Sequence, residues 1–133
     1  MKAVKARITK SLPHMATMEA CDNSGARIVK LISVKGHKTV RGRLSAAGVG
    51  DFVKVVVIEG KPDVRKQVFP AIIVRQRQPY RRKDGTRIKF EDNAAVILKD
   101  ESGNPKGTMI KGPIAKEASE RWPALSKVAK MIV

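Results

Sequence analysis

The sequence predicts a mainly β protein: a small antiparallel β-barrel with a projecting ribbon and short helices at its C-terminal end. Short β-branched apolar segments fill the middle of the chain, and turn residues separate them. Apolar residues at helical spacing are confined to about the last twenty residues. Because no long helical pattern lies between the strands, an antiparallel barrel is favoured over parallel βαβ units.

Four segments have the length and composition of strands, namely residues 27–34, 52–58, 71–74 and 94–98. Turn-forming residues lie before the first segment, at 22–25, and between the segments, at 48–51 and 61–63. Asn and Asp side chains can bond to nearby backbone there, Pro fixes its own φ, and Gly adopts positive φ. These stretches are therefore predicted turns.

Asp84-Gly85 lies between two basic extended arms and predicts a tight two-residue hairpin turn. Such a turn projects the arms away from the barrel as a basic finger, which carries Arg81, Arg82, Lys83 and Arg87. A second projection, bent at glycines, carries Lys35, Lys38, Arg41 and Arg43. Glycine lets a backbone approach a phosphate closely; plain turn geometry is the alternative explanation of Gly36 and Gly42.

The end of the chain changes character. Gly112-Pro113 and Pro123 are predicted helix starts. One helical face is predicted from spacing, formed by Leu125, Val128, Ala129 and Ile132. We expect two short helices that pack against the barrel or a partner. No linker separates two domains, so one domain is expected, with a basic segment 1–17, a barrel 18–110 and a helical region 111–133.

The charge of the chain is large and segregated. Its 133 residues include 28 Lys and Arg but 12 Asp and Glu, for a net charge of +16. Residues 1–10, 23–50 and 75–89 account for all of this excess, and the rest is neutral. A compact fold tolerates such self-repulsion best when a polyanion neutralises it. Segregated blocks therefore indicate a binding surface for nucleic acid; a generic soluble basic face is the alternative.

Other classes of protein fit the sequence poorly. The 42% hydrophobic content excludes a disordered basic tail, and the single Cys21 excludes an internal disulfide. The longest apolar run, 94–98, is far shorter than the about 20 residues of a membrane helix. The basic N-terminus lacks the apolar stretch of a signal peptide, and Pro13 argues against a helical transit peptide.

Catalytic and metal chemistry find no support in the residue spacing. His14, His37 and Cys21 are scattered, without the spacing of a zinc site. As a nucleophile Cys21 would need a positioned base, and a small buried side chain is the simpler interpretation. No nucleotide-binding glycine loop is present, because Gly50 leads into a strand. We therefore expect no metal, no cofactor and no enzymatic activity.

The aromatic residues discriminate between kinds of nucleic acid. Of five, only Tyr80 lies in a basic block, whereas single-strand binders stack bases on aromatic platforms. This favours phosphate and sugar contacts on folded RNA, with Arg as a planar phosphate fork. A membrane-binding helix is disfavoured because the blocks are strand- and turn-like. The predicted RNA-binding residues are Lys35, Lys38, Arg41, Arg43, Arg75, Arg77, Arg81, Arg82, Lys83, Arg87 and Lys89. Replacing Arg81, Arg82 and Lys83 with Ala is expected to weaken RNA binding and leave thermal unfolding nearly unchanged.

Several motifs occur in a specific order and spacing. An apolar quartet at 71–74 is followed by nine residues, then by Asp84-Gly85, Phe90, Asn93 and Val96-Ile97. The stretches 22–26, 47–51 and 107–113 complete the set. From Met18 onward the chain resembles the universal large-subunit ribosomal protein fourteen family, and residues 80–85 and Trp122-Pro123 are similar to archaeal and eukaryotic members.

The resemblance implies a five-stranded barrel with a projecting β-ribbon and a small C-terminal helical region. It implies a structural constituent of the large subunit, in the cytoplasm, that binds large-subunit ribosomal RNA at the face meeting the small subunit. It further implies inter-subunit bridges to small-subunit ribosomal RNA and contacts with neighbouring ribosomal proteins. The anti-association initiation factor six docks near the C-terminal region of archaeal and eukaryotic members, which suggests Lys111, Trp122 and Lys127 as partner-facing residues. For Trp122 a buried core position is the alternative, and it is favoured.

Two other functions are weighed beside this one. A free-standing RNA- or DNA-binding barrel, such as a regulator or chaperone, would show the same charge pattern. An RNA-modifying enzyme would need a cofactor or an activated group, and the sequence shows neither.

Overall fold

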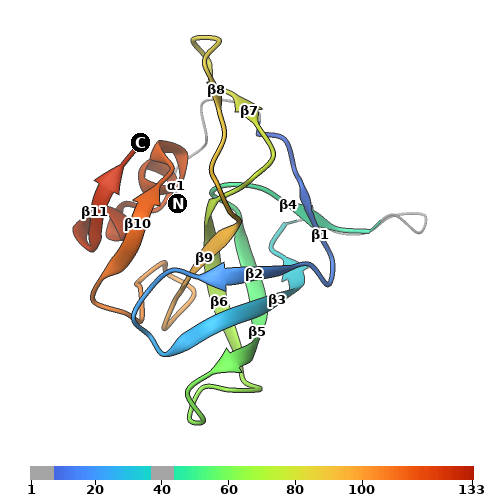
Figure 1. Ribbon diagram of the computed structural model, residues 1–133, viewed down its shortest axis with the longest axis vertical. Helices are drawn as coiled ribbons and strands as arrows, with labels where there is room; N and C mark the ends of the chain where they lie inside the picture. Colours follow the sequence, from blue (N-terminus) through green and yellow to red (C-terminus); the bar gives the residue numbers. More distant parts are fainter. Residues whose placement is uncertain (1–7, 37–43) are drawn as a thin grey trace.

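Five strands close into a barrel in the computed structural model, which describes residues 8–36 and 44–133 (Figure 1). In order around the barrel they are β2 (Thr17–Ala20), β3 (Ala26–Val34), β5 (Phe52–Gly60), β6 (Val68–Arg75) and β9 (Ala94–Ile97). The four segments predicted as strands are β3, β5, β6 and β9, so the predicted small barrel is confirmed.

One pair of barrel strands is parallel. Neighbouring strands run antiparallel from β2 through to β9, but β9 meets β2 in parallel, with Glu19 opposite Ala94 and Ala20 opposite Ala95. An odd number of strands cannot close with alternating directions throughout, so one pair has to be parallel. The expectation of a purely antiparallel barrel is therefore wrong at this seam.

The second half of β6 and all of β9 are buried on both faces. Residues of one face, including Ala71 and Ile73, fill the barrel interior. Residues of the other face, including Ile72, pack against the C-terminal part of the chain. This two-sided burial is the physical reason for the unbroken apolar runs at 71–74 and 94–98.

The C-terminal part forms a small layer outside the barrel (Figure 1). It contains β10 (Ile110–Ile114), α1 (Lys116–Arg121), the 3₁₀ helix η1 (Pro123–Lys127) and β11 (Ala129–Ile132). The predicted helix start at Pro123 is confirmed, but the start at Gly112-Pro113 is wrong because both residues lie in β10.

The helical face predicted from Leu125 to Ile132 is also wrong. Residues 129–132 form β11, which pairs in parallel with β10. Leu125 is buried in η1, whereas Ile132 is exposed. Pairing with β10 satisfies the backbone of this segment, and that tertiary contact outweighs the local apolar spacing.

A ribbon projects from one end of the barrel, as predicted (Figure 1). It is formed by β7 (Tyr80–Arg81) and β8 (Arg87–Ile88), which pair antiparallel. We call residues 77–89 the ribbon.

The tip of the ribbon spans residues 83–85 rather than Asp84-Gly85 alone. The Gly85 amide donates to the Arg82 carbonyl at 2.9 Å, and the Arg82 amide donates to the Thr86 carbonyl at 2.8 Å. Gly85 has a φ of +91°, the left-handed conformation that glycine adopts at the end of such a loop. The Asp84 side chain accepts a bond from the Thr86 amide at 2.9 Å, which lowers the pKa of this carboxyl.

A second antiparallel pair, β1 (Leu12–Pro13) and β4 (Ala46–Ala47), lies beside the barrel. Leu12 and Ala47 are buried in the same apolar cluster as the barrel interior. Part of the segment 1–17, expected only to be basic, therefore contributes to the core.

The predicted turn at 22–25 holds a distant segment in place. The Asn23 side chain accepts bonds from the amides of Thr108 at 2.8 Å and Met109 at 3.3 Å, and it donates to Thr108 Oγ1 at 2.8 Å. Gly107 packs so closely that a Cβ there would lie 2.5 Å from Asn23 Oδ1. This contact explains why the motifs at 22–26 and 107–113 occur together.

Replacing Asp22 with Asn is expected to remove a pH dependence of stability. The buried carboxylate accepts bonds from Ser24 Oγ at 2.7 Å and the Ile97 amide at 3.0 Å. Burial nevertheless raises the pKa of Asp22 above its ordinary value of 3.8. Its contribution to stability is therefore full below that ordinary value and is lost as the pH rises through the raised pKa.

An Asn side chain at this position keeps an oxygen for the Ile97 amide and can donate to Ser24 Oγ. In urea titrations from about pH 3 to pH 7, the free energy of unfolding of the wild type should fall relative to that of Asp22→Asn. A difference that stays constant over this range would contradict the expectation.

Candidate nucleic-acid interface

Five cations of the ribbon face solvent. They are Arg77, Arg81, Lys83, Arg87 and Lys89, and all are exposed. Within residues 8–36 and 44–133, the structure shows no ion pair to any of them. The one acid on the ribbon, Asp84, caps the tip instead. The ribbon therefore presents a dense positive charge that no neighbouring carboxylate in this part of the chain neutralises.

Arg75 is not part of this surface. Only 8% of the residue is exposed, and its Nε lies 2.9 Å from Asp92 Oδ1. Its Nη1 donates to the carbonyl oxygens of Lys111 at 3.1 Å and Pro113 at 3.2 Å. Placing Arg75 among the RNA-facing residues was therefore a wrong expectation: its guanidinium ties β6 to β10 inside the protein.

Arg82 is also held by the protein. Its Nε donates to Glu117 Oε1 at 2.7 Å, and its Nη2 donates to the carbonyl oxygen of Val133 at 2.6 Å. Because removing Arg82 leaves a buried carboxylate unpaired, its loss destabilises the fold. This buried ion pair contradicts the expectation that Ala at residues 81–83 leaves thermal unfolding nearly unchanged.

The predicted second projection is only partly described. Lys35 is exposed, and its Nζ lies 5.1 Å from the centroid of the Phe52 ring, a cation–π contact. Lys38, Arg41 and Arg43 lie outside the described residues, so their predicted RNA contacts stay predictions.

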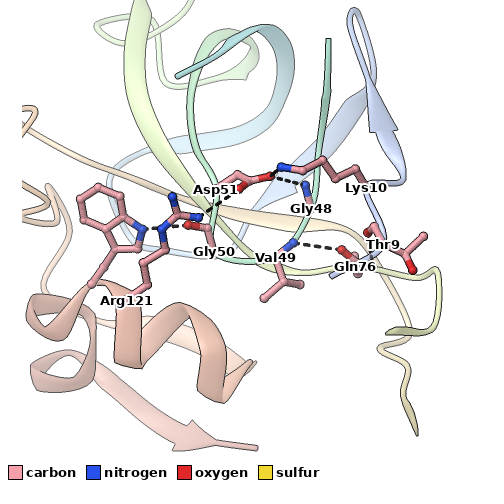
Figure 2. Close-up of polar contacts among 9 residues, drawn as sticks. Thr9, Lys10, Gly48, Val49, Gly50, Asp51, Gln76 and Arg121 are labelled. Carbon is pink, nitrogen blue, oxygen red and sulfur yellow. Dashed lines mark hydrogen bonds and ion pairs between the residues drawn. The ribbon is translucent and has the colours of Figure 1, made fainter. Parts of the chain in front are cut away.

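The turn at 48–51 binds two other parts of the chain through Asp51 (Figure 2). Asp51 Oδ2 accepts bonds from the Gly48 amide at 2.8 Å and from Lys10 Nζ at 2.9 Å. Asp51 Oδ1 accepts a bond from Arg121 Nη1 at 3.1 Å. One carboxylate thereby joins the N-terminal segment and α1.

The same turn binds the end of β6 through Gln76 (Figure 2). Gln76 is fully buried; its Oε1 accepts a bond from the Val49 amide at 2.9 Å, and its Nε2 donates to the Thr9 carbonyl at 3.0 Å. Since residue 76 directly precedes the ribbon, these bonds place the start of the described N-terminal segment near the ribbon base.

Trp122 lies in the core. It is 4% exposed, its Nε1 donates to the Gly50 carbonyl at 2.8 Å, and its ring centroid is 5.5 Å from that of Phe52. The interpretation of Trp122 as a buried core residue is confirmed, and its assignment as a partner-facing residue is wrong. Lys111 and Lys127, the other two partner-facing residues suggested by the sequence, are exposed.

The described residues give no support for a catalytic or metal-binding site. Within 8–36 and 44–133, no group of three or more His, Cys, Asp or Glu could hold a metal ion. Burial raises the pKa of Cys21 to about 12, so the thiol stays protonated at neutral pH. No helix in this part of the chain is long and apolar enough to cross a membrane.

Three residues that hold this surface in place were not predicted from the sequence to have a structural role. Asp51 and Gln76 anchor the turn, and Glu117 holds Arg82. For Glu117 a sequence signal did exist: Tyr80 and Arg82 are two apart in a predicted extended arm and so share a face. A buried aromatic on that face indicates that Arg82 also points inward.

Known proteins resemble this chain over nearly its whole length. A family model described as ribosomal protein L14p/L23e matches residues 11–133. A protein of Nanoarchaeum equitans named large ribosomal subunit protein uL14 is 56% identical over 133 residues, 100% of both chains. Proteins of the same name are 54% identical in Methanococcus maripaludis, over 99% of each chain, and 60% identical in Pyrobaculum islandicum, over 95% of this chain and 88% of that one.

The matches confirm the resemblance that the motifs indicate. The matched residues, 11–133, span every motif quoted from the sequence, from the turn at 22–26 to the stretch at 107–113. The barrel and the ribbon of the structure are also those that the family resemblance implies. The chain belongs to the ribosomal protein L14p/L23e family.

Proposed function

We propose that this protein is a structural constituent of the large ribosomal subunit and binds large-subunit ribosomal RNA through the ribbon. The observation that carries the proposal is the set of five exposed ribbon cations without an ion pair in the described chain. It is supported by relatives that are named large ribosomal subunit proteins and match over the full length.

The geometry suits phosphate contacts on folded RNA. Arg and Lys bind phosphate oxygens and fix register without reading base edges. The barrel holds the ribbon on a rigid base, because the second half of β6, which leads into the ribbon, is buried on both faces. In this role the protein neutralises and positions RNA and catalyses no reaction.

Finer features of the proposal concern the partners. The ribbon lies at the face of the subunit that meets the small subunit and contributes to inter-subunit bridges with small-subunit ribosomal RNA. The C-terminal part contacts neighbouring ribosomal proteins and, in this proposal, the anti-association initiation factor six. Exposed Lys111 and Lys127 and three exposed apolar residues at positions 131–133 support a protein contact there, namely Met131, Ile132 and Val133.

Sedimentation of a tagged form from a cell lysate tests this proposal. We expect the protein to migrate with the large subunit, and migration with free RNA or free protein would instead favour a free-standing RNA-binding barrel. With purified ribosomal RNA, the affinity should fall as a power of salt, with an exponent of about 0.7–0.9 per neutralised phosphate. An affinity independent of salt would exclude the proposed phosphate contacts.

A further inference from the structure

The two arginines after Tyr80 point to opposite faces of the ribbon. Successive residues of an extended strand alternate between faces. Tyr80 is buried, Arg81 is exposed, and Arg82 returns to the face of Tyr80 with its side chain only 20% exposed. Tyr80 and Arg82 thereby both reach Glu117 in the first turn of α1.

Glu117 binds both side chains with its two oxygens. Besides the bond to Arg82 Nε, Glu117 Oε2 accepts bonds from Tyr80 Oη at 2.8 Å and from Arg82 Nη2 at 3.4 Å. The Glu117 side chain is 8% exposed. Burial, together with the bond to Glu117 and its charge, raises the pKa of Tyr80, so the phenol stays protonated and donates. Charge-assisted bonds of this kind are strong and directional.

A further bond connects the ribbon base to the residue that follows the last strand. Arg82 Nη2 donates to the main-chain oxygen of Val133, next to β11, and the Val133 amide donates to the Ile114 carbonyl at 2.9 Å. The ribbon base is thus fixed to α1 and to the β10–β11 pair. Besides pairing with each other, the ribbon strands pack against the apolar cluster outside the barrel through Tyr80 and Ile88.

The charge of Arg82 is also neutralised within the protein. Glu117 neutralises it at 2.7 Å, whereas Arg81, Lys83 and Arg87 have no ion pair in the described chain. Bound RNA therefore gains little from Arg82 directly, although it lies between two exposed cations.

We propose that Glu117, Arg82 and Tyr80 form a latch that sets the direction in which the ribbon leaves the barrel. Glu117 is then a positioning residue for RNA binding, and this inference rests on the proposed function. Once the latch is open, the ribbon samples other directions. If the competent direction falls to about a tenth of the population, the apparent Kd rises about tenfold.

Two matched substitutions in α1 test the latch. Glu117→Gln and Glu120→Gln each remove one negative charge, so electrostatics alone predicts equal or tighter RNA binding for both. Glu120 is exposed, with Lys116 Nζ at 4.0 Å. The latch predicts that Glu117→Gln weakens binding of the purified protein to a large-subunit ribosomal RNA transcript about tenfold, while Glu120→Gln stays within about twofold. If Glu117→Gln binds as tightly as Glu120→Gln, the latch is wrong.

A charge-neutral double variant decides the same question without an unpaired buried charge. The double variant Arg82→Gln with Glu117→Gln keeps the net charge of the wild type. If circular dichroism shows that Glu117→Gln alone does not fold, the double variant is the test of the latch. The latch predicts a lower affinity with an unchanged salt exponent. If Arg82 were a phosphate ligand, the exponent would fall by about 0.7–0.9, and that result would overturn the proposal.

Arg81→Gln separates failure of the latch from failure of the proposed function. It removes an exposed ribbon cation, so it should lower both the affinity and the salt exponent. If Arg81→Gln weakens binding but the latch variants do not, only the latch is wrong. If Arg81→Gln binds like the wild type, the ribbon does not bind this RNA and both proposals fail.

Discussion

Replacing Arg81, Lys83 and Arg87 with Gln is expected to weaken binding to large-subunit ribosomal RNA on the order of 100-fold at about 0.1 M salt. Each of the three side chains is exposed and lacks an ion pair in the described chain. Losing them should lower the salt exponent by about 2. The electrostatic contribution is small at about 1 M salt, so the wild type and the variant should bind alike there. If their salt exponents differ by about 2, a tenfold drop to about 0.1 M salt makes their affinities differ by about 100-fold.

The matched control removes the same charge from the other end of the barrel. Lys61, Arg65 and Lys66 are exposed in the loop between β5 and β6, which lies opposite the ribbon (Figure 1). Their replacement with Gln should change the salt exponent by well under 1. Thermal unfolding of the ribbon variant should match the wild type, because exposed side chains without partners contribute little to stability. Equal weakening by both triple variants would show that total charge, and not the ribbon, drives binding.

Replacing Trp122 with Ala is expected to lower the free energy of unfolding by about 3–5 kcal/mol. The indole is buried against Phe52 and donates to the Gly50 carbonyl. A Cβ at Gly103 would lie 2.8 Å from the Trp122 ring, so the indole fills its site tightly. Because domains of this size have only about 5–15 kcal/mol of stability, this loss is a large share.

Urea unfolding followed by far-ultraviolet circular dichroism measures the effect, since the chain has one Trp and the substitution removes its fluorescence. Trp122→Phe keeps an aromatic ring but loses the bond to Gly50, and the loss should be smaller, about 1–3 kcal/mol. Leu44→Ala is the control, because Leu44 is 69% exposed and its truncation should cost less than about 0.5 kcal/mol. A loss below about 1 kcal/mol for Trp122→Ala would contradict the core assignment.

Four of the five barrel strands were predictable because their signals are local; the fifth, β2, was not among the predicted segments. Runs of consecutive apolar residues at 71–74 and 94–98 reflect burial on both faces, and turn residues mark where each strand ends. The two-residue strands β1 and β4 carry no such pattern and escaped prediction. The same is true of β11, whose sequence has helical spacing but whose backbone pairs with β10.

The positive charge of the candidate site could be predicted from the sequence, but the direction of each side chain could not. The sequence places seven cations at 75–89, and the structure separates them by their partners. Asp92 lies 17 positions from Arg75, and Glu117 lies 35 positions from Arg82, so no local pattern predicts either pair. Alternation along the extended arm is the one local signal that could separate Arg81 from Arg82, but the sequence-based prediction places both among the RNA-binding residues.

Four of the five barrel strands, the ribbon, the segregation of charge and the family resemblance could be predicted from the amino-acid sequence. These follow from composition, period and motif spacing, which are properties of neighbouring residues. Only the folded chain shows which described ribbon cations have an ion pair, that Trp122 belongs to the core, and that one barrel pair is parallel. Ion pairs, burial and barrel closure depend on residues that are far apart in the sequence and meet when the chain folds.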